Sequence, residues 1–229
     1  MSMLKKIYNF LFKEDSFASW VVNIILALIV IQFIIYPSLT AITGSALPVV
    51  AVVSGSMEHK GVGVCGEEIN GICIDRNSEW LEMCGVRVDK KYFLLTEFWD
   101  TCGSYYESNN ITYEQFTSFP FARGFDTGDV MFIKKYEPDE LRIGDVVIFI
   151  SNTGKPIIHR IISFNNTTDD FLFTTKGDHN QFSNPGPSDR EIDITYDEYV
   201  GSAVFRVPYV GYVKIYFEVM VHFIQNFFK

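Results

Sequence analysis

The longest apolar run of the sequence lies close to its N-terminus. Residues 20–36 read WVVNIILALIVIQFIIY, broken only by one Asn and one Gln, and the next three residues bring the run to 20. About 20 predominantly apolar residues are what a helix needs to cross the hydrocarbon core of a bilayer. We therefore predict a transmembrane anchor over residues 20–39.

The charges before this run predict its orientation. The tail over residues 1–19 carries Lys5, Lys6 and Lys13 against two acidic side chains. Because basic flanks stay on the cytoplasmic side of a membrane, we expect a cytoplasmic tail and an extracytoplasmic body. A cleaved secretory signal is the alternative, but the apolar part of such a signal usually has about 7–15 residues.

Beyond the anchor, short runs rich in Ile, Val, Phe and Thr alternate with turns that often contain Gly-Asp. Such runs are typical of strands, and Gly and Asp are residues that turns favour. The run at residues 48–53 is fully apolar, as in a buried strand. Further strands are predicted at residues 129–135, 145–151, 157–164, 170–176, 199–207 and 211–215. The predicted fold is mainly β, a curled, barrel-like antiparallel sheet.

The stretch from residue 58 to residue 124 differs, because Gly, Cys, Asn and charged residues break its periodicity. We interpret it as an insertion stapled by disulfides within an extracytoplasmic domain over residues 40–213. A short helix is predicted at residues 89–101. A second is predicted after Thr112-Tyr-Glu-Gln, which has the pattern of a capping box.

The last stretch, residues 214–229, has apolar side chains at the i, i+3, i+4 and i+7 positions and polar ones on another face. This spacing predicts an amphipathic helix rather than a second span. The helix could pack on the sheet or lie on the bilayer, and we favour the bilayer.

Composition and charge narrow the class of protein. The chain has 229 residues, of which 48% are hydrophobic and 21% charged, and this composition is not typical of a disordered chain. Its 28 acidic side chains outnumber 19 basic ones, for a net charge of −9. Because a nucleic-acid-binding domain is usually basic, we expect no nucleic-acid partner.

The four cysteines, Cys65, Cys73, Cys84 and Cys102, all follow the apolar run. An even number of cysteines outside the cytosol predicts two disulfides. We favour the sequential pairing, Cys65 with Cys73 and Cys84 with Cys102, because both loops are short, and the crossed pairings remain open. A zinc site is the alternative, but no two cysteines have the close spacing of zinc ligands.

A candidate nucleophile follows the first apolar strand. Ser54-Gly55-Ser56-Met57 places serines beside a glycine, where a hydroxyl can be presented without steric cover. A serine becomes a nucleophile only with a base within hydrogen-bond reach. A plain turn without chemistry is the alternative interpretation.

The sequence offers four histidines as bases: His59, His159, His179 and His222. His59 lies in a polar turn, where we expect it to be exposed. His222 falls on the polar face of the last helix, and His179 lies in a loop. His159 differs, because it interrupts an Ile-rich strand.

Four segments together carry a resemblance. Ser54–Glu58, Gly144–Phe149, Ile158–Ile161 and Lys176–Asn180 occur in the order of the boxes of type I signal peptidases. The sequence resembles the archaeal and endoplasmic-reticulum branch, in which His takes the place of the bacterial Lys. The likeness runs from the anchor to about Gly211.

This resemblance implies a membrane-anchored serine endopeptidase that removes signal peptides after small residues at −3 and −1. It implies no cofactor and no metal. The implied partners are signal-peptide-bearing preproteins and the lipid bilayer, on the archaeal cell exterior or in the lumen of the endoplasmic reticulum. Whether the chain works in a complex stays open. A non-catalytic tethered binding module and a related processing protease are the alternatives.

The resemblance also implies roles for single residues. Ser56 matches the nucleophile and His159 the general base. Ser54 matches a hydroxyl that assists an oxyanion hole beside the backbone N–H of Ser56.

The acid of the site is less defined by the resemblance. Asp178 matches one family aspartate, but Asn184 stands where a second often occurs, and Asp189 is the next candidate. We therefore expect Asp178 or Asp189 to orient His159. His59 is a further departure, because the family commonly has Pro at that position.

Overall fold

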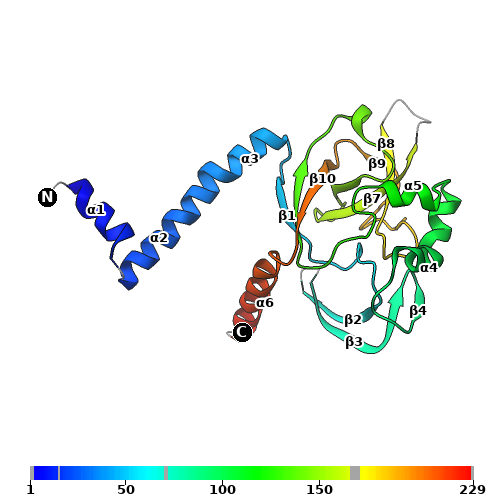
Figure 1. The fold of residues 1–229 in the computed structure, drawn as a ribbon, viewed down its shortest axis with the longest axis horizontal. Coiled ribbons are helices and arrows are strands. Elements are labelled where there is room, and N and C mark those ends of the chain that lie inside the picture. Colours follow the sequence, from blue (N-terminus) through cyan, green and yellow to red (C-terminus); the bar gives the residue numbers. More distant parts are fainter. Residues whose placement is uncertain (1–2, 15, 70–71, 166–170, 228–229) are drawn as a thin grey trace. The chain divides into compact units, whose positions relative to one another are not determined.

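The computed structural model divides the chain into two compact units, Met1–Pro48 and Val49–Lys229. Figure 1 shows the elements of each unit. The residues that the structure describes are 3–14, 16–69, 72–165 and 171–227.

The first unit is helical. Helix α1 (Met3–Phe12) precedes a continuous helix made of α2 (Phe17–Val30), a π-helical segment and α3 (Tyr36–Thr43). The Asn23 amide, one of the two polar groups in the apolar run, donates to the Leu11 carbonyl at 2.8 Å and so ties α2 to α1. Among the described residues, one helix is long and apolar enough to cross a membrane, and it spans Phe17–Thr43.

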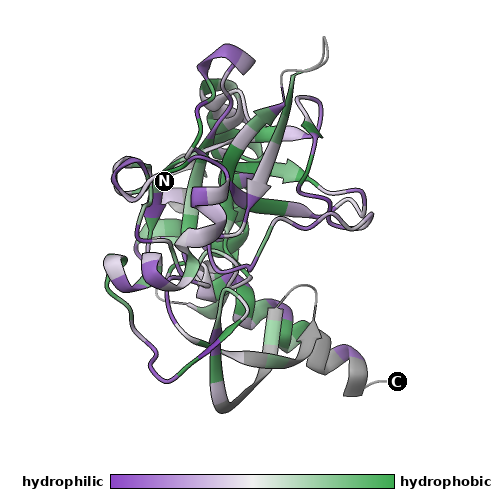
Figure 2. Ribbon diagram, turned by 90° about the vertical axis from the view of Figure 1, so that its right-hand side faces the viewer, coloured by the Kyte–Doolittle hydropathy of each residue, from purple (hydrophilic) through white to green (hydrophobic). Residues whose placement is uncertain are grey.

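The second unit is mainly β, as the sequence predicts. Over the described residues, seven antiparallel strands form its larger sheet, in the order β1-β5-β10-β6-β7-β8-β9. In Figure 2 the strands of this sheet are mostly hydrophobic, and many of the loops at its ends are hydrophilic. The strands are β1 (Val49–Ala51), β5 (Val130–Lys134), β6 (Val146–Ile150), β7 (Pro156–Asn165), β8 (Leu172–Lys176), β9 (Ile194–Thr195) and β10 (Tyr199–Val207).

The larger sheet has its own apolar core. Val147 and Phe149 of β6 pack with Ile161 of β7 and Phe173 of β8, and all four side chains are at most 1% exposed. Burial of several aliphatic and aromatic side chains, each worth about 1.5–3 kcal/mol, holds these strands in register. This core fixes the strands from which the candidate site is built.

The segment between β1 and β5 forms a second structure of its own. It contains the three-stranded sheet β2-β3-β4 and two helices, α4 (Leu95–Ser108) and α5 (Tyr113–Ser118). The sheet consists of β2 (Val62–Ile69), β3 (Ile72–Met83) and β4 (Val86–Val88). The predicted capping box is confirmed, because the Thr112 hydroxyl accepts the Gln115 N–H and starts α5.

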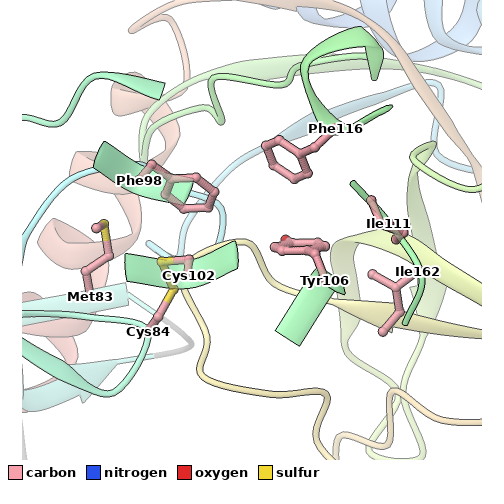
Figure 3. Close-up of a cluster of buried hydrophobic side chains, with 8 residues drawn as sticks. All are labelled: Met83, Cys84, Phe98, Cys102, Tyr106, Ile111, Phe116 and Ile162. Atoms are coloured by element: carbon pink, nitrogen blue, oxygen red, sulfur yellow. A yellow bond between two sulfur atoms is a disulfide. The ribbon is translucent and has the colours of Figure 1, made fainter. Parts of the chain in front are cut away.

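A separate apolar cluster joins this segment to the larger sheet (Figure 3). It contains the Cys84–Cys102 disulfide, and a second disulfide links Cys65 to Cys73, so the sequential pairing is confirmed. The buried members of the cluster are Met83, Cys84, Phe98, Cys102, Tyr106, Ile111, Phe116 and Ile162.

Two predicted elements differ from the structure. No strand forms at residues 211–215, because Gly211 lies in a tight turn and the C-terminal helix α6 (Tyr212–Phe227) begins directly after it. A Cβ at Gly211 would lie 2.9 Å from the Gly128 and Asp129 carbonyl oxygens, so this turn packs closely on the two residues that precede β5. The helix expected at 89–101 begins later, at Leu95.

Candidate active site

The candidate nucleophile lies in a turn that directly follows β1. The Val52 N–H donates to the Asp129 carbonyl at 2.8 Å, which extends the pairing of β1 with β5 up to the turn. The Ser56 carbonyl accepts the N–H of His179 at 2.8 Å. The hydroxyls of Ser54 and Ser56 lie 3.2 Å apart. Both serine side chains are therefore held on one surface of the turn.

His159 approaches this turn from the middle of β7. Its Nε2 lies 2.9 Å from the Oγ of Ser56, although 103 residues separate the two along the chain. The residue is 6% exposed, so the imidazole is largely shielded from solvent. A Cβ at Gly177 would lie 2.8 Å from the same Nε2, which explains why a glycine stands there. The arrangement brings a hydroxyl and a potential base within hydrogen-bond distance.

The carboxylate that faces the other ring nitrogen of His159 is that of Glu191. Its Oε1 is in contact with Nδ1, and the residue is 1% exposed. The second oxygen, Oε2, accepts the N–H of Asn184. Two backbone bonds of 2.8 Å hold the residue, from the Glu191 N–H to the Asn184 carbonyl and from the Thr175 N–H to the Glu191 carbonyl. Glu191 lies in the loop after β8 and is thus tied to Thr175 of β8 and to Asn184 of the same loop.

The two aspartates that the sequence singles out lie elsewhere. Asp178 is fully buried and forms a two-point ion pair with Arg160, at 2.9 Å to Nε and 2.7 Å to Nη2. Its carboxylate also meets His59 Nε2 at 2.9 Å. Asp189 lies in the loop after β8, where its Oδ1 accepts the Thr153 hydroxyl at 3.3 Å.

The electrostatics of this buried cluster favour an ionised Asp178. Burial alone would raise the pKa of its carboxyl, but the Arg160 guanidinium and the His59 hydrogen bond hold that pKa well below its ordinary value. Burial lowers the pKa of Lys176 to about 8, although the Asp178 carboxylate opposes this shift. The Lys176 ammonium donates to the carbonyls of Gly177 and Asp178 at 3.0 and 3.1 Å.

The remaining histidines take other positions. The expectation that His59 is exposed is wrong, because its side chain is only 7% exposed and its ring stacks on Phe98 at 3.6 Å. Nδ1 of His179 lies 3.2 Å from the Glu58 carbonyl, and His222 lies on α6.

Two features of the site escaped the sequence analysis, Glu191 and the burial of His59. The signal that points toward Glu191 is Asn184 at the position where the resemblance expects an acid. The burial of His59 depends on aromatic residues some 40–60 positions later in the chain, and it has no local signal.

Known proteins resemble this chain over part of its length. It is 33% identical to the signal peptidase complex catalytic subunit SEC11C of Homo sapiens over 94 residues. These residues are 40% of this chain and 49% of the human protein. The SEC11 catalytic subunit of Plasmodium falciparum is 33% identical over 96 residues, or 41% of this chain and 51% of that protein. That of Scheffersomyces stipitis is 30% identical over 102 residues, or 43% of this chain and 61% of that protein.

The chain thus spans about half the length of the human and Plasmodium relatives. No protein family model matches it. Over the matched stretch, these relatives confirm the resemblance to the endoplasmic-reticulum branch of the type I signal peptidases.

Proposed function

We propose that the chain is a membrane-anchored serine endopeptidase that cleaves signal peptides from preproteins after small residues at −3 and −1. The observation that carries this proposal is the 2.9 Å distance between Ser56 Oγ and His159 Nε2. The names of the relatives support the substrate class, because each is a catalytic subunit of a signal peptidase complex.

In the proposed reaction, Ser56 Oγ attacks the carbonyl carbon of the −1 residue, and His159 Nε2 takes the hydroxyl proton. The Ser56 N–H and the Ser54 hydroxyl donate to the oxyanion that forms. His159 then gives the proton to the nitrogen of the +1 residue, which leaves as the new N-terminus. A water, deprotonated by His159, hydrolyses the Ser56 ester and releases the signal peptide.

We assign the orienting role to Glu191 rather than to Asp178 or Asp189. A carboxylate on Nδ1 holds the imidazole in the tautomer that leaves Nε2 free to accept a proton, and it stabilises the imidazolium that follows. Glu191 meets this requirement by its contact with Nδ1 and its burial. The second oxygen of Glu191 accepts the N–H of Asn184, and Asn184 occupies the position where the resemblance expects the acid.

The anchor is part of the proposal. The apolar helix Phe17–Thr43 has the length and composition to hold the protein in a bilayer, with the tail in the cytoplasm and the catalytic unit outside. Signal peptides end in small residues just beyond their apolar core, near the bilayer surface. We further propose that the chain assembles with other membrane subunits, as the names of the relatives imply for those proteins.

The groove for the substrate is proposed along β1. This strand pairs with β5 on one side, and among the described strands its other edge is unpaired. An extended peptide can add to such an edge through backbone hydrogen bonds. Because β1 leads into the turn of Ser56, a peptide on this edge would carry its scissile bond to the hydroxyl.

The test is the processing of a purified preprotein by the full chain in detergent or liposomes. The variants Ser56→Ala and His159→Ala are each expected to lose activity by about 10⁴-fold or more, with the fold intact. Ser118→Ala is the matched control, because Ser118 is exposed at the end of α5 and its hydroxyl donates to the Gln115 carbonyl. Processing by Ser56→Ala at the wild-type rate would overturn the proposal.

A further inference from the structure

We propose that His59 is a positioning residue for the turn of Ser56, and that helix α4 of the insertion holds His59 in place. This inference rests on the proposed function. The insertion here means residues 58–124, which contain β2, β3, β4, α4 and α5. It adds a role for a segment and a histidine that the chemistry of Ser56, His159 and Glu191 does not use.

His59 is fixed on two sides. It follows Ser56 by three residues, and its Nε2 lies 2.9 Å from Asp178 Oδ2. Its ring lies parallel to that of Phe98 in α4, with centroids 3.6 Å apart and planes 4° from parallel. The side chain therefore joins the turn of Ser56 to a buried carboxylate on one side and to helix α4 on the other.

Asp178 is a rigid partner for His59. The Arg160 guanidinium binds it at two points and also donates to the carbonyls of Pro120, Phe121 and Gly144, at 2.7–3.0 Å. Arg160 directly follows His159 on β7. The position of Asp178 is thus coupled to the strand that carries the candidate base.

The insertion contributes to the same cluster directly. The Tyr106 hydroxyl, from α4, donates to Asp178 Oδ1 at 2.8 Å. The Cys84 N–H donates to the His179 carbonyl at 2.9 Å, and the Cys84–Cys102 disulfide ties this contact to α4 (Figure 3). Asp178 and His179 are therefore both held by hydrogen bonds from the insertion.

The end of the insertion also packs on the turn. Gly124 adopts a φ of +67°, and a Cβ there would lie 2.3 Å from the Met57 carbonyl oxygen and 2.6 Å from Cδ2 of His59. The Phe125 N–H donates to that same Met57 carbonyl at 3.1 Å. The C-terminal end of the insertion and the residue that follows it therefore contact the residues just after Ser56.

These contacts have a consequence for turnover. A misplacement of about 1 Å between reacting groups can lower the rate about 100-fold. Loss of the contacts of His59 with Asp178 and Phe98 would let the turn of Ser56 move relative to His159. This movement would slow the chemical step more than it would weaken substrate binding. A purely structural role would lower the amount of folded protein and leave kcat per folded molecule unchanged.

The test compares kcat and KM for preprotein processing by His59→Ala, His59→Leu and His59→Gln in the full chain. Gln retains an N–H donor that can reach Asp178, whereas Leu fills space without one. We expect kcat to fall about 10–100-fold in the Ala and Leu variants, with KM within about threefold of wild type. We expect Gln to restore most of the loss.

The control is Phe173→Leu, which weakens the core of the larger sheet without touching the turn of Ser56. It is expected to lower the unfolding midpoint and to keep the wild-type kcat per folded molecule. If His59→Ala does not fold, the comparison of Gln with Leu decides in its place. Equal kcat in folded Leu and Gln variants would overturn the inference. Equal activity of wild type and Ser56→Ala would instead remove the proposed function, and this inference with it.

Discussion

At the scale of single residues, the contact between Glu191 and His159 determines how well the proposed base is oriented. An imidazole can rotate and can carry its proton on either nitrogen, and a carboxylate on Nδ1 removes both freedoms. Glu191 is buried and held by Asn184 and Thr175, so its own position is well defined.

We expect Glu191→Gln to lower kcat by about 10⁴-fold while the protein stays folded, because an amide can hold the ring in the wrong tautomer. The measurement is the rate of preprotein processing. Asp189→Asn is the matched control and should leave the rate within about twofold, since Asp189 contacts Thr153 rather than His159. A large loss in the Asp189 variant with none in the Glu191 variant would reverse the assignment.

A second prediction at this scale concerns Lys176, which is fully buried with a pKa of about 8 against an ordinary value of 10.5. Between these values the unfolded chain binds a proton that the folded chain has released. The contribution of Lys176 to the free energy of unfolding should therefore increase as pH rises from about 8 to about 10.5.

Denaturant unfolding of wild type and Lys176→Met across this pH range measures the effect. The difference in stability between them should change by up to about 3 kcal/mol in favour of wild type as pH rises. A difference that stays constant with pH would show that the ammonium is not desolvated in the fold.

Sequence patterns singled out Ser56, which follows an apolar strand, and His159, which interrupts one, and the resemblance suggested their roles; the structure brings the two side chains within 2.9 Å of each other. They could not locate Glu191, because its contact with His159 depends on the conformation of the loop after β8, in which the Asn184 N–H donates to Glu191. The aspartates that the sequence suggested have the right chemistry, but Asp178 is occupied by Arg160 and His59.

At the scale of elements, the strands of the larger sheet were predictable and those of the insertion were not. The strand predicted at 199–207 coincides with β10. By contrast, the pairing of β2 with β3 shifts register between Gly63 and Val64 and twice more before Glu68. Each shift breaks the two-residue alternation from which a strand is recognised. The insertion is therefore ordered without a clear periodicity.

The two disulfides provide a prediction at this scale. By loop length, loss of Cys84–Cys102 should cost about 3 kcal/mol of stability and loss of Cys65–Cys73 about 2.5 kcal/mol. Cys84 contacts the backbone carbonyls of Asp178 and His179 in the buried cluster, so the first bond lies next to the candidate site. We therefore expect paired Cys→Ser variants to have similar unfolding midpoints but different activities.

Processing assays and denaturant unfolding, both without reductant, check this expectation. The variant that lacks Cys84–Cys102 should lose kcat at temperatures where it is folded, and the variant that lacks Cys65–Cys73 should keep it. Equal activity in the two folded variants would show that the insertion stabilises the protein without acting on the site.

At the scale of the whole molecule, the proposal needs the apolar helix Phe17–Thr43 to hold the protein in a bilayer. The helix has 27 residues and is predominantly apolar. A long apolar helix of this kind is suited to contact with lipid. Length and composition predicted this element from the sequence, but topology depends on the membrane and requires its own measurement.

We expect the expressed chain to resist extraction from membranes by alkaline carbonate. Arg substitutions at Leu26 and Ile29 should release it, because each costs about 2.5–3.5 kcal/mol at the centre of a span. Val86→Arg, on an exposed strand, is the matched control and should stay bound. Protection of residues 49–227 from protease added on the cytoplasmic side would support the orientation, and cleavage there would contradict it.

The most direct test of the central proposal is to trap the covalent intermediate. A preprotein is mixed with the full chain, quenched in acid at short times and mapped by mass spectrometry. The account predicts a signal peptide joined through its C-terminal carbonyl to the Oγ of Ser56. It predicts no such adduct in Ser56→Ala. Cleavage of the preprotein by Ser56→Ala, or an adduct on a different residue, would contradict it.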